Sequence, residues 1–513
     1  MQKSSEAASH QIGKRTTLGT GLLIVSKVLS RSADLAALTV LARLLTPADF
    51  GIVALAMSAL TIAEAVLEVP VGLALMSLRD RTKAHFDTAF TLQLVRGAVL
   101  ASILLIAAWP LAAFYHDDRL FALLCVLSLA PVSNGLVSPR MTEYAVRMDF
   151  RPIFAMETLS KLISVVVSVG AAWWTGSYWS LAFGTLAAPL SGVLISFIIA
   201  PYFPALTFSE WKVFAGYLRW TTLTQTLSAT NWQMDQLLLG RWVGRFELGS
   251  FSMALSLSSV PGQIFIGQTF RPLLVGFSLV RNDRPRLIQA YLKSVDSIVA
   301  VGLPLLAGMH LTADPLIRVF LGEKWSAAAP MLQWLSLASI PSLFIGAIGP
   351  LGISLNRPSM FFFVALTEFL FKLPLMLIGL LYFGITGVLV VRLVTAIVVA
   401  GCAMLAVQGL IELPIRTQLL SPWRPVVSVI VMAVTVVLTS GMGLGERNHL
   451  ELIYWLARTT VTGAVVYGAV LFLLWFVSGR PDGIETKVVE FLSSRLVAVI
   501  GKSSVMSAGR PEN

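Results

Sequence analysis

The chain has 513 residues, of which 56% are hydrophobic and 13% are charged. A soluble domain carries about 25% charged residues, and a single hydrophobic core stops growing near ~300 residues. Composition and length together therefore exclude a soluble protein built on one large core. The net charge of +11 does not indicate nucleic-acid binding, because the basic residues form no cluster interleaved with aromatic side chains.

Apolar stretches of about 20 residues, the length needed to cross a bilayer ~30 Å thick, recur along the chain. The sequence therefore predicts an all-α integral membrane protein with about fourteen transmembrane helices and short connections. The helices are expected, within a few residues, at 18–42, 51–75, 88–114, 120–138, 152–174, 178–200, 216–239, 248–274, 292–314, 329–353, 359–382, 385–409, 423–442 and 454–477.

Both ends of the chain are polar. The first apolar run is interrupted by Lys27, Arg31 and Asp34, which argues against a cleaved signal peptide and for an uncleaved first helix. After the last predicted helix, Glu485–Ile500 carries apolar side chains at helical spacing. We expect this segment to lie on the membrane surface as an amphipathic helix.

The distribution of lysine and arginine predicts the orientation in the membrane. With the N-terminus in the cytoplasm, the cytoplasmic loops and ends hold about three times as many basic residues as the opposite side, as the positive-inside rule requires. An even number of helices then places the C-terminus in the cytoplasm as well.

The chain also shows signs of an internal duplication. Short matching motifs stand at similar offsets in the two halves: ETLSKL (Glu157 to Leu162) and EFLFKL (Glu368 to Leu373), VLSLA (Val126 to Ala130) and WLSLA (Trp334 to Ala338), and Phe50-Gly51 and Leu248-Gly249. Because a six-helix unit has an even number of spans, two such units share one orientation. We therefore expect two pseudo-symmetric lobes with a site between them.

The duplication predicts the domain organisation. Helices 1–6 form an N-terminal lobe at 1–205, and helices 7–12 form a C-terminal lobe at 206–410. Helices 13 and 14 follow at 411–478, and a cytoplasmic tail with the amphipathic helix occupies 479–513.

Ionisable side chains at membrane depth are the candidate functional residues, because each costs about 2.5–3.5 kcal/mol at the centre of a helix and so marks an interior cavity. Arg96 and Arg392 have no partner in their own helices, and Lys27 and Arg31 outnumber Asp34. These four cations are the better candidates for binding an anion, because guanidinium suits phosphate especially well. Snorkelling to the membrane surface is the alternative role for the two lone arginines.

Two further lysines, Lys161 and Lys372, each stand four residues after a glutamate, Glu157 and Glu368. Each lysine is a candidate ligand for a diphosphate or a glycan. Each Glu–Lys couple could equally be a structural pair that neutralises itself within one helix.

Three acids are candidates for ion coupling: Asp34, Glu64 and Asp235. Their placement suggests that a buried carboxyl could take up and release a proton during transport. No catalytic motif is present: the chain has no HExxH or GxSxG sequence, and its GKS at Gly501 to Ser503 lacks the first glycine of a P-loop. We expect a protein that is not an enzyme and that needs no metal or cofactor.

Three longer stretches carry a family resemblance: ARLLTPADFG (Ala42 to Gly51), FLGEKWSAAAPMLQWLSL (Phe320 to Leu337), and MDQLLLGRWVG with LGSFSMALSLSSVP (Met234 to Pro261). They resemble the Wzx-like oligosaccharide flippases. That family belongs to the superfamily that also holds the multidrug extruders and the lipid II flippase. The resemblance covers residues from about 18 to 410, and it is strongest to the subgroup that serves exopolysaccharide production.

The resemblance implies a V-shaped, two-lobed protein of the bacterial inner membrane that works by alternating access. Its implied cargo is an oligosaccharide on undecaprenyl diphosphate, moved between leaflets for exopolysaccharide or lipopolysaccharide synthesis. Membrane lipid, a polysaccharide polymerase and the export machinery are the expected partners, and nucleic acid is not. The signature stretches are expected to serve packing and hinge geometry.

Three alternatives stay open. An ion-coupled antiporter of small molecules could share the fold, although the cations of the first helix disfavour organic cations as its cargo. A lipid II flippase fits the signature stretches less well. A membrane polysaccharide polymerase would be expected to carry a large periplasmic loop, which the sequence lacks.

Overall fold

The structure is a computed structural model that describes residues 29–68, 71–78, 80–147, 149–211, 219–357, 359–440, 449–480 and 485–486. All regular secondary structure in these ranges is helical, which confirms the predicted all-α fold class. Lys27 and nearly all of the predicted amphipathic tail lie outside the described residues.

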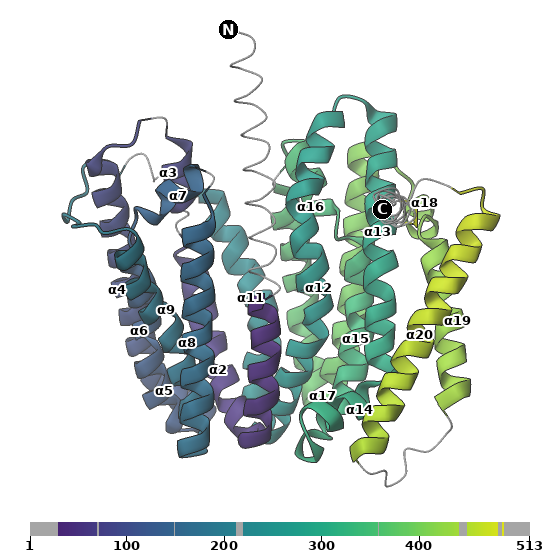
Figure 1. The fold of residues 1–513 in the computed structure, drawn as a ribbon, viewed down its shortest axis with the longest axis horizontal. Helices are drawn as coiled ribbons and strands as arrows, with labels where there is room; N and C mark the ends of the chain where they lie inside the picture. The colour runs from purple at the N-terminus through teal and green to yellow at the C-terminus, as the bar shows by residue number, and fades with distance from the viewer. Residues whose placement is uncertain are drawn as a thin grey trace, which may run out of the picture. The chain divides into compact units, whose positions relative to one another are not determined.

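The chain packs into two compact units, which we describe separately (Figure 1). Unit 1 comprises Met1–Leu257, Ile317–Met331 and Phe361–Thr395, and unit 2 comprises Ser258–Leu316, Leu332–Met360 and Ala396–Asn513. The predicted lobe boundaries rest on the internal repeat and stay a prediction.

Among the described residues, unit 1 contains the first ten helices named here and parts of three longer ones. Its helices are 29–44, α2 (Pro47–Val66), α3 (Val71–Ser77), α4 (Lys83–Tyr115), α5 (Arg119–Leu127), α6 (Leu129–Gly135), α7 (Met141–Val146), α8 (Arg151–Thr175), α9 (Trp179–Ile199) and α11 (Arg219–Trp242), with a 3₁₀ turn at Glu323–Trp325. Three long helices have residues in both units: α12 (Arg245–Val280), α15 (Ala328–Phe344) and α17 (Ser359–Ile411).

Unit 2 is built around α13 and the last helix pair. Its elements are α13 (Arg284–Leu311), most of α15, α16 (Ile348–Ser354), α18 (Ile415–Leu420), α19 (Trp423–Ser440) and α20 (His449–Val477), and the short α14 (Ala313–Phe320) runs from unit 2 into unit 1. Its core packs Tyr291 and Val299 of α13 against Leu343 of α15 and Met432 of α19.

Eight helices among the described residues are long and apolar enough to cross a membrane. Many large apolar side chains on them are exposed, such as Ile106, Trp173 and Leu473. A helix that is apolar on its outer as well as its inner face is typical of a protein surrounded by lipid rather than water. The chain is therefore a multi-pass membrane protein, and the exact number of spans stays a prediction.

The longest apolar stretch, Phe362–Ile411, is not one helix. Gly384 has φ 59° and ψ −141°, so two helices meet there at the break that the sequence predicts between 382 and 385. A side chain would be strained at this backbone conformation, which is essentially restricted to glycine. After the turn, Gly387 packs so closely on Gly379 that an added Cβ would lie 2.1 Å from the Gly379 carbonyl oxygen.

The start of α2 shows how the sequence fixes a helix end. Thr46 is the N-cap, Pro47 stands in the first turn, and Asp49 completes a capping box. The Thr46 hydroxyl accepts from the Asp49 amide, while the Asp49 carboxylate accepts from the Thr46 amide at 2.9 Å. Such reciprocal bonds satisfy two amides that the helix leaves unpaired.

Candidate functional site

The most deeply buried candidate residue is Asp235, in the middle of α11. Its carboxylate is wholly buried. Oδ1 lies 2.8 Å from Nζ of Lys372, and Oδ2 accepts a hydrogen bond from Arg392. Lys372 also donates to the main-chain oxygen of Asn231 at 2.6 Å. Buried charges persist only when they are paired in this way.

The two cations reach Asp235 from either side of the break in α17. Lys372 precedes Gly384 and Arg392 follows it, so the turn at this glycine brings both side chains to one carboxylate. Glu368, one turn before Lys372, interacts electrostatically with all three charged groups. The four side chains together carry two positive and two negative formal charges.

A second, more exposed pair stands in the N-terminal half. Lys161 of α8 forms an ion pair with Asp34 of the helix at 29–44. Arg31 lies 3.6 Å from the other oxygen of Asp34. The side chains of Asp34 and Lys161 are 37% and 31% exposed, so this pair contributes less to stability than the Asp235 cluster does.

The two clusters occupy matching places in the predicted duplication. Asp34 and Lys161 belong to predicted helices 1 and 5, and Asp235 and Lys372 belong to predicted helices 7 and 11. In the sequence, the acidic partner predicted for each lysine is the glutamate one helical turn earlier on the same helix. The structure adds an aspartate from a different helix to each lysine, and it does so twice in corresponding positions.

Arg96 has a different role from the other predicted cations. Its guanidinium donates to the main-chain oxygens of Leu67 at 2.5 Å and Glu64 at 3.0 Å. These are carbonyls of the last turn of α2, which a helix leaves without partners. Arg96 therefore caps α2, and its charge complements the helix dipole. The Glu64 carboxylate in turn accepts a hydrogen bond from Asn134.

Sequence reasoning missed one buried charge cluster. In unit 2, Arg424 lies 3.3 Å from Asp296 and 3.0 Å from Glu485. Asp296 was overlooked because the helix was predicted to start at 292, whereas α13 starts at Arg284. The earlier start places Asp296 well inside the helix. In the described ranges, no group of three His, Cys, Asp or Glu side chains could hold a metal ion.

Comparison with known proteins gives the relatives of this chain. A family model described as "Polysaccharide biosynthesis protein" matches residues 40–330. The succinoglycan biosynthesis transport protein ExoT of Rhizobium meliloti (strain 1021) is 24% identical, over 63% of this chain and 66% of its own length. The lipopolysaccharide biosynthesis protein WzxC of Escherichia coli (strain K12) is 23% identical, over 80% of this chain and 85% of its own.

Solved structures share the fold. The lipid II flippase MurJ in an inward closed conformation superposes with a TM-score of 0.70 at 14% identity, covering 89% of this chain and 99% of MurJ. A multidrug resistance MATE transporter in an inward-facing conformation gives a TM-score of 0.59 at 14% identity, covering 75% of this chain and 94% of the transporter.

Proposed function

The chain belongs to the polysaccharide biosynthesis protein family, and on that basis we propose that it is a flippase for a lipid-linked oligosaccharide. Its cargo is a repeat unit on undecaprenyl diphosphate, which it moves by alternating access for exopolysaccharide or lipopolysaccharide synthesis. Relatives named for succinoglycan transport and lipopolysaccharide biosynthesis support this assignment.

We place the protein in a bacterial inner membrane, with both termini in the cytoplasm. The excess of basic residues on one side supports this orientation. The cargo then moves from the cytoplasmic to the periplasmic leaflet, where a polysaccharide polymerase and the export machinery receive it. In this proposal the protein transports its cargo and catalyses no reaction. The name of the relative ExoT, a transport protein, supports this.

The observation that carries the proposal is a lysine–aspartate pair that occurs twice, buried at Lys372 and Asp235 and partly exposed at Lys161 and Asp34. A carboxylate and a phosphate accept the same hydrogen bonds from lysine and arginine. Asp235 therefore holds Lys372 and Arg392 in the place where a phosphate could replace it. Asp34 holds Lys161 and Arg31 in the same manner. We assign these four cations to the diphosphate and the sugars next to it, with Lys27 as a further candidate.

Arg96 contributes less directly in this account. Because its guanidinium caps α2 through two main-chain oxygens, it fixes the end of that helix. We keep it as a candidate for binding cargo only if α2 moves and frees those bonds. Glu157 and Glu368 remain structural partners of the lysines on their helices.

We propose that Asp34, Glu64 or Asp235 couples transport to a proton. A neutral aspartic acid would release its lysine to bind an anion, so protonation of Asp235 or Asp34 and binding of the diphosphate favour one another. If transport into vesicles is unchanged after the proton gradient is collapsed, this part of the proposal fails.

The second candidate function is a small-molecule antiporter, because the fold is shared with a MATE transporter. An antiporter for organic cations needs an acid that is free to bind them. Asp235 is paired with two cations, which favours an anionic cargo.

A deletion strain tests the proposal. The strain loses its polymer, and wild type restores it. Variants Arg392→Ala and Lys372→Ala restore at most roughly a tenth of it, because each loses a charge-assisted contact to the cargo. Arg286→Ala, which removes an arginine whose side chain is 76% exposed, restores it fully. Unchanged polymer with raised drug sensitivity would replace the proposal with the antiporter.

A further inference from the structure

The three signature stretches lie far apart in the sequence, but in unit 1 the first of them contacts each of the other two. One runs through the end of the helix at 29–44 and the start of α2, the second through the turn between α11 and α12, and the third through the 3₁₀ turn at Glu323–Trp325. Except for Asp235, which lies in the second stretch, the proposed binding of cargo uses no residue of these stretches, so the contacts among them need a separate explanation.

The third stretch closes over the end of the first helix. Trp325 is wholly buried, and its indole nitrogen donates to the main-chain oxygen of Ala42 at 2.8 Å. Lys324 donates to the main-chain oxygen of Leu45 at 2.6 Å. In the opposite direction, Arg43 donates to the main-chain oxygen of Val319 at 2.7 Å. These bonds satisfy carbonyls that the helix end leaves without partners.

The first and second stretches cross at two glycines. A Cβ added to Gly249 would lie 1.7 Å from the main-chain oxygen of Pro47. A Cβ added to Gly51 would lie 2.2 Å from the main-chain oxygen of Arg245. The backbones at the starts of α2 and α12 are therefore in direct contact, which only glycine permits at both positions.

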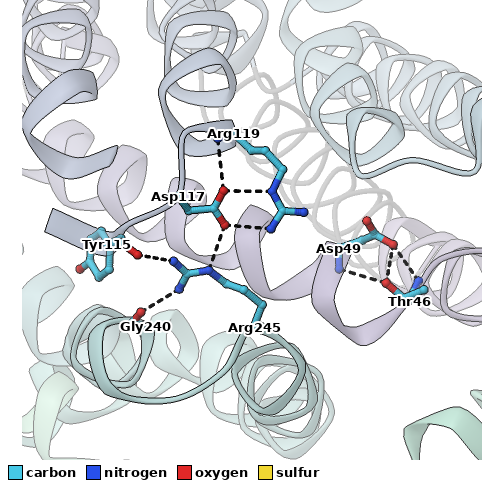
Figure 2. Close-up of polar contacts among 7 residues, drawn as sticks. All are labelled: Thr46, Asp49, Tyr115, Asp117, Arg119, Gly240 and Arg245. Atoms are coloured by element: carbon cyan, nitrogen blue, oxygen red, sulfur yellow. Dashed lines mark hydrogen bonds and ion pairs between the residues drawn. The ribbon is translucent and has the colours of Figure 1, made fainter. Parts of the chain in front are cut away.

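One arginine fastens this crossing (Figure 2). Arg245 donates to the main-chain oxygens of Tyr115 and Gly240, each at 2.7 Å, and to Oδ2 of Asp117 at 3.1 Å. Arg119 donates to both oxygens of the same carboxylate at 2.9 Å. The guanidinium thus ties the end of α4 to the turn between α11 and α12.

Apart from the bonds Arg245–Gly240 and Arg119–Asp117, which stay within one lobe, these contacts join the predicted N-terminal lobe to the predicted C-terminal lobe. Ala42, Gly51 and Asp117 come from the first lobe, and Trp325, Gly249 and Arg245 come from the second. The positive-inside rule places all of them on the non-cytoplasmic side. A transporter that opens to that side must separate its lobes there.

We propose that the signature stretches form the outer gate of the transporter and that this gate is closed in the structure. The contact between the Gly51 and Gly249 backbones, called the seal below, closes the gate, and the bonds of Arg245, called the latch, hold it closed. This goes beyond the proposed function, because it concerns the opening of the protein and not the identity of the cargo. Opening must break the bonds of Arg245 to Tyr115 and Asp117 and part the two glycine backbones.

The latch is held by charge at neutral pH. Burial by itself would raise the pKa of Asp117, but hydrogen bonds from Arg119 and Arg245 outweigh it and hold the pKa below its ordinary value. Other ionisable groups that face the two arginines are Asp49, through its interaction with Arg119, Tyr178, whose ring lies 5.8 Å from the Arg119 guanidinium, and Tyr115, which interacts with Arg245. Uptake of a proton by Asp117 therefore does not open the gate in the physiological range.

A buried reporter cysteine tests the gate in the full chain. The native Cys125 and Cys402 are replaced by alanine, and Ser58→Cys is introduced. Ser58 is wholly buried against Gln233 and Gln236 of α11. It stands about 10 Å inward of Gly51 along α2. A membrane-impermeant thiol reagent is then applied to the periplasmic side of spheroplasts.

We expect slow labelling in this background. With Gly249→Ala or Arg245→Ala added, labelling becomes roughly tenfold faster. The first variant inserts a methyl group between the two backbones, and the second removes a charge-assisted hydrogen bond. The matched control is Gly170→Ala, a helical glycine with open space around it, which leaves the rate unchanged. Arg245→Lys keeps the positive charge but loses the several donors of the guanidinium, and it gives an intermediate rate. This variant still tests the gate if Gly249→Ala does not fold.

Unchanged labelling in well-expressed Arg245→Ala and Arg245→Lys proteins would overturn the gate. So would faster labelling only from the cytoplasmic side, in inverted vesicles. Because the assay needs no cargo, its result is independent of the flippase proposal. If the cysteine at position 58 is labelled as expected but the wild-type protein does not restore polymer, the gate proposal stands and the flippase proposal fails.

Discussion

The Nζ atom of Lys372 lies 2.8 Å from Oδ1 of Asp235, and both side chains are almost wholly buried. Neither group could be left alone at this depth, since an unpaired buried charge costs several kcal/mol. The pair also has a more exposed counterpart in Lys161 and Asp34. A pair that is costly to break and repeated in both halves is a natural place for a cargo charge to exchange with a protein charge.

Removal of Asp235 should destabilise the protein strongly. Asp235→Ala leaves Lys372 and Arg392 buried without an anion, and we expect a loss of about 3–5 kcal/mol. Asp34→Ala, at the more exposed pair, should cost about 1 kcal/mol or less. Thermal unfolding in detergent measures both. Equal losses for the two variants would contradict the difference in burial.

Gly384→Ala should destabilise the hairpin in α17, because its backbone conformation is essentially restricted to glycine. The expected cost is about 1–3 kcal/mol. Gly401 and Gly409 lie in the same element with open space around them, so alanine there should be neutral or slightly stabilising. If Gly384→Ala melts at the same temperature as Gly401→Ala, the turn is not where the structure places it.

Trp325→Ala should lose about 3–5 kcal/mol, since it removes a wholly buried indole. Trp325→Phe keeps an aromatic ring beside Phe50, whose centroid lies 5.1 Å away, but loses the bond to Ala42. It should cost about 1 kcal/mol for that bond. Melting temperatures in the order wild type, Phe, Ala would agree with this contact, and equal values for all three would not.

Asp117 should stabilise the protein in a way that acid removes. Its pKa in the folded protein lies below the ordinary value, so its contribution is complete above the unfolded pKa and is lost as the pH falls through the folded pKa. The difference in melting temperature between wild type and Asp117→Asn should be constant above about pH 5 and should shrink below about pH 4. A difference that grows in acid would show the opposite sign and reject the ion pairs to Arg119 and Arg245.

Local pattern predicted some features well and others not at all. The break near Gly384 follows from apolar runs and their ends, which are properties of neighbouring residues. The partners of Arg96 and Arg392 cannot be predicted from neighbouring residues, because they stand 29 and 157 residues away in the sequence. Asp296 was missed through a helix boundary, the least certain feature of any sequence pattern. The signature stretches were expected to serve packing and hinge geometry, and only the structure shows that the first contacts each of the other two.

The central claim is that Lys372 and Arg392 release Asp235 to hold the diphosphate of the cargo. The most direct test is transport of a fluorescent undecaprenyl-diphosphate-linked oligosaccharide in proteoliposomes that contain wild type, Arg392→Ala or the exposed-arginine control Arg286→Ala. The account predicts that wild type and Arg286→Ala transport at the same rate, while Arg392→Ala is slower by roughly tenfold or more. Equal rates for all three proteins, each folded and equally reconstituted, would contradict it.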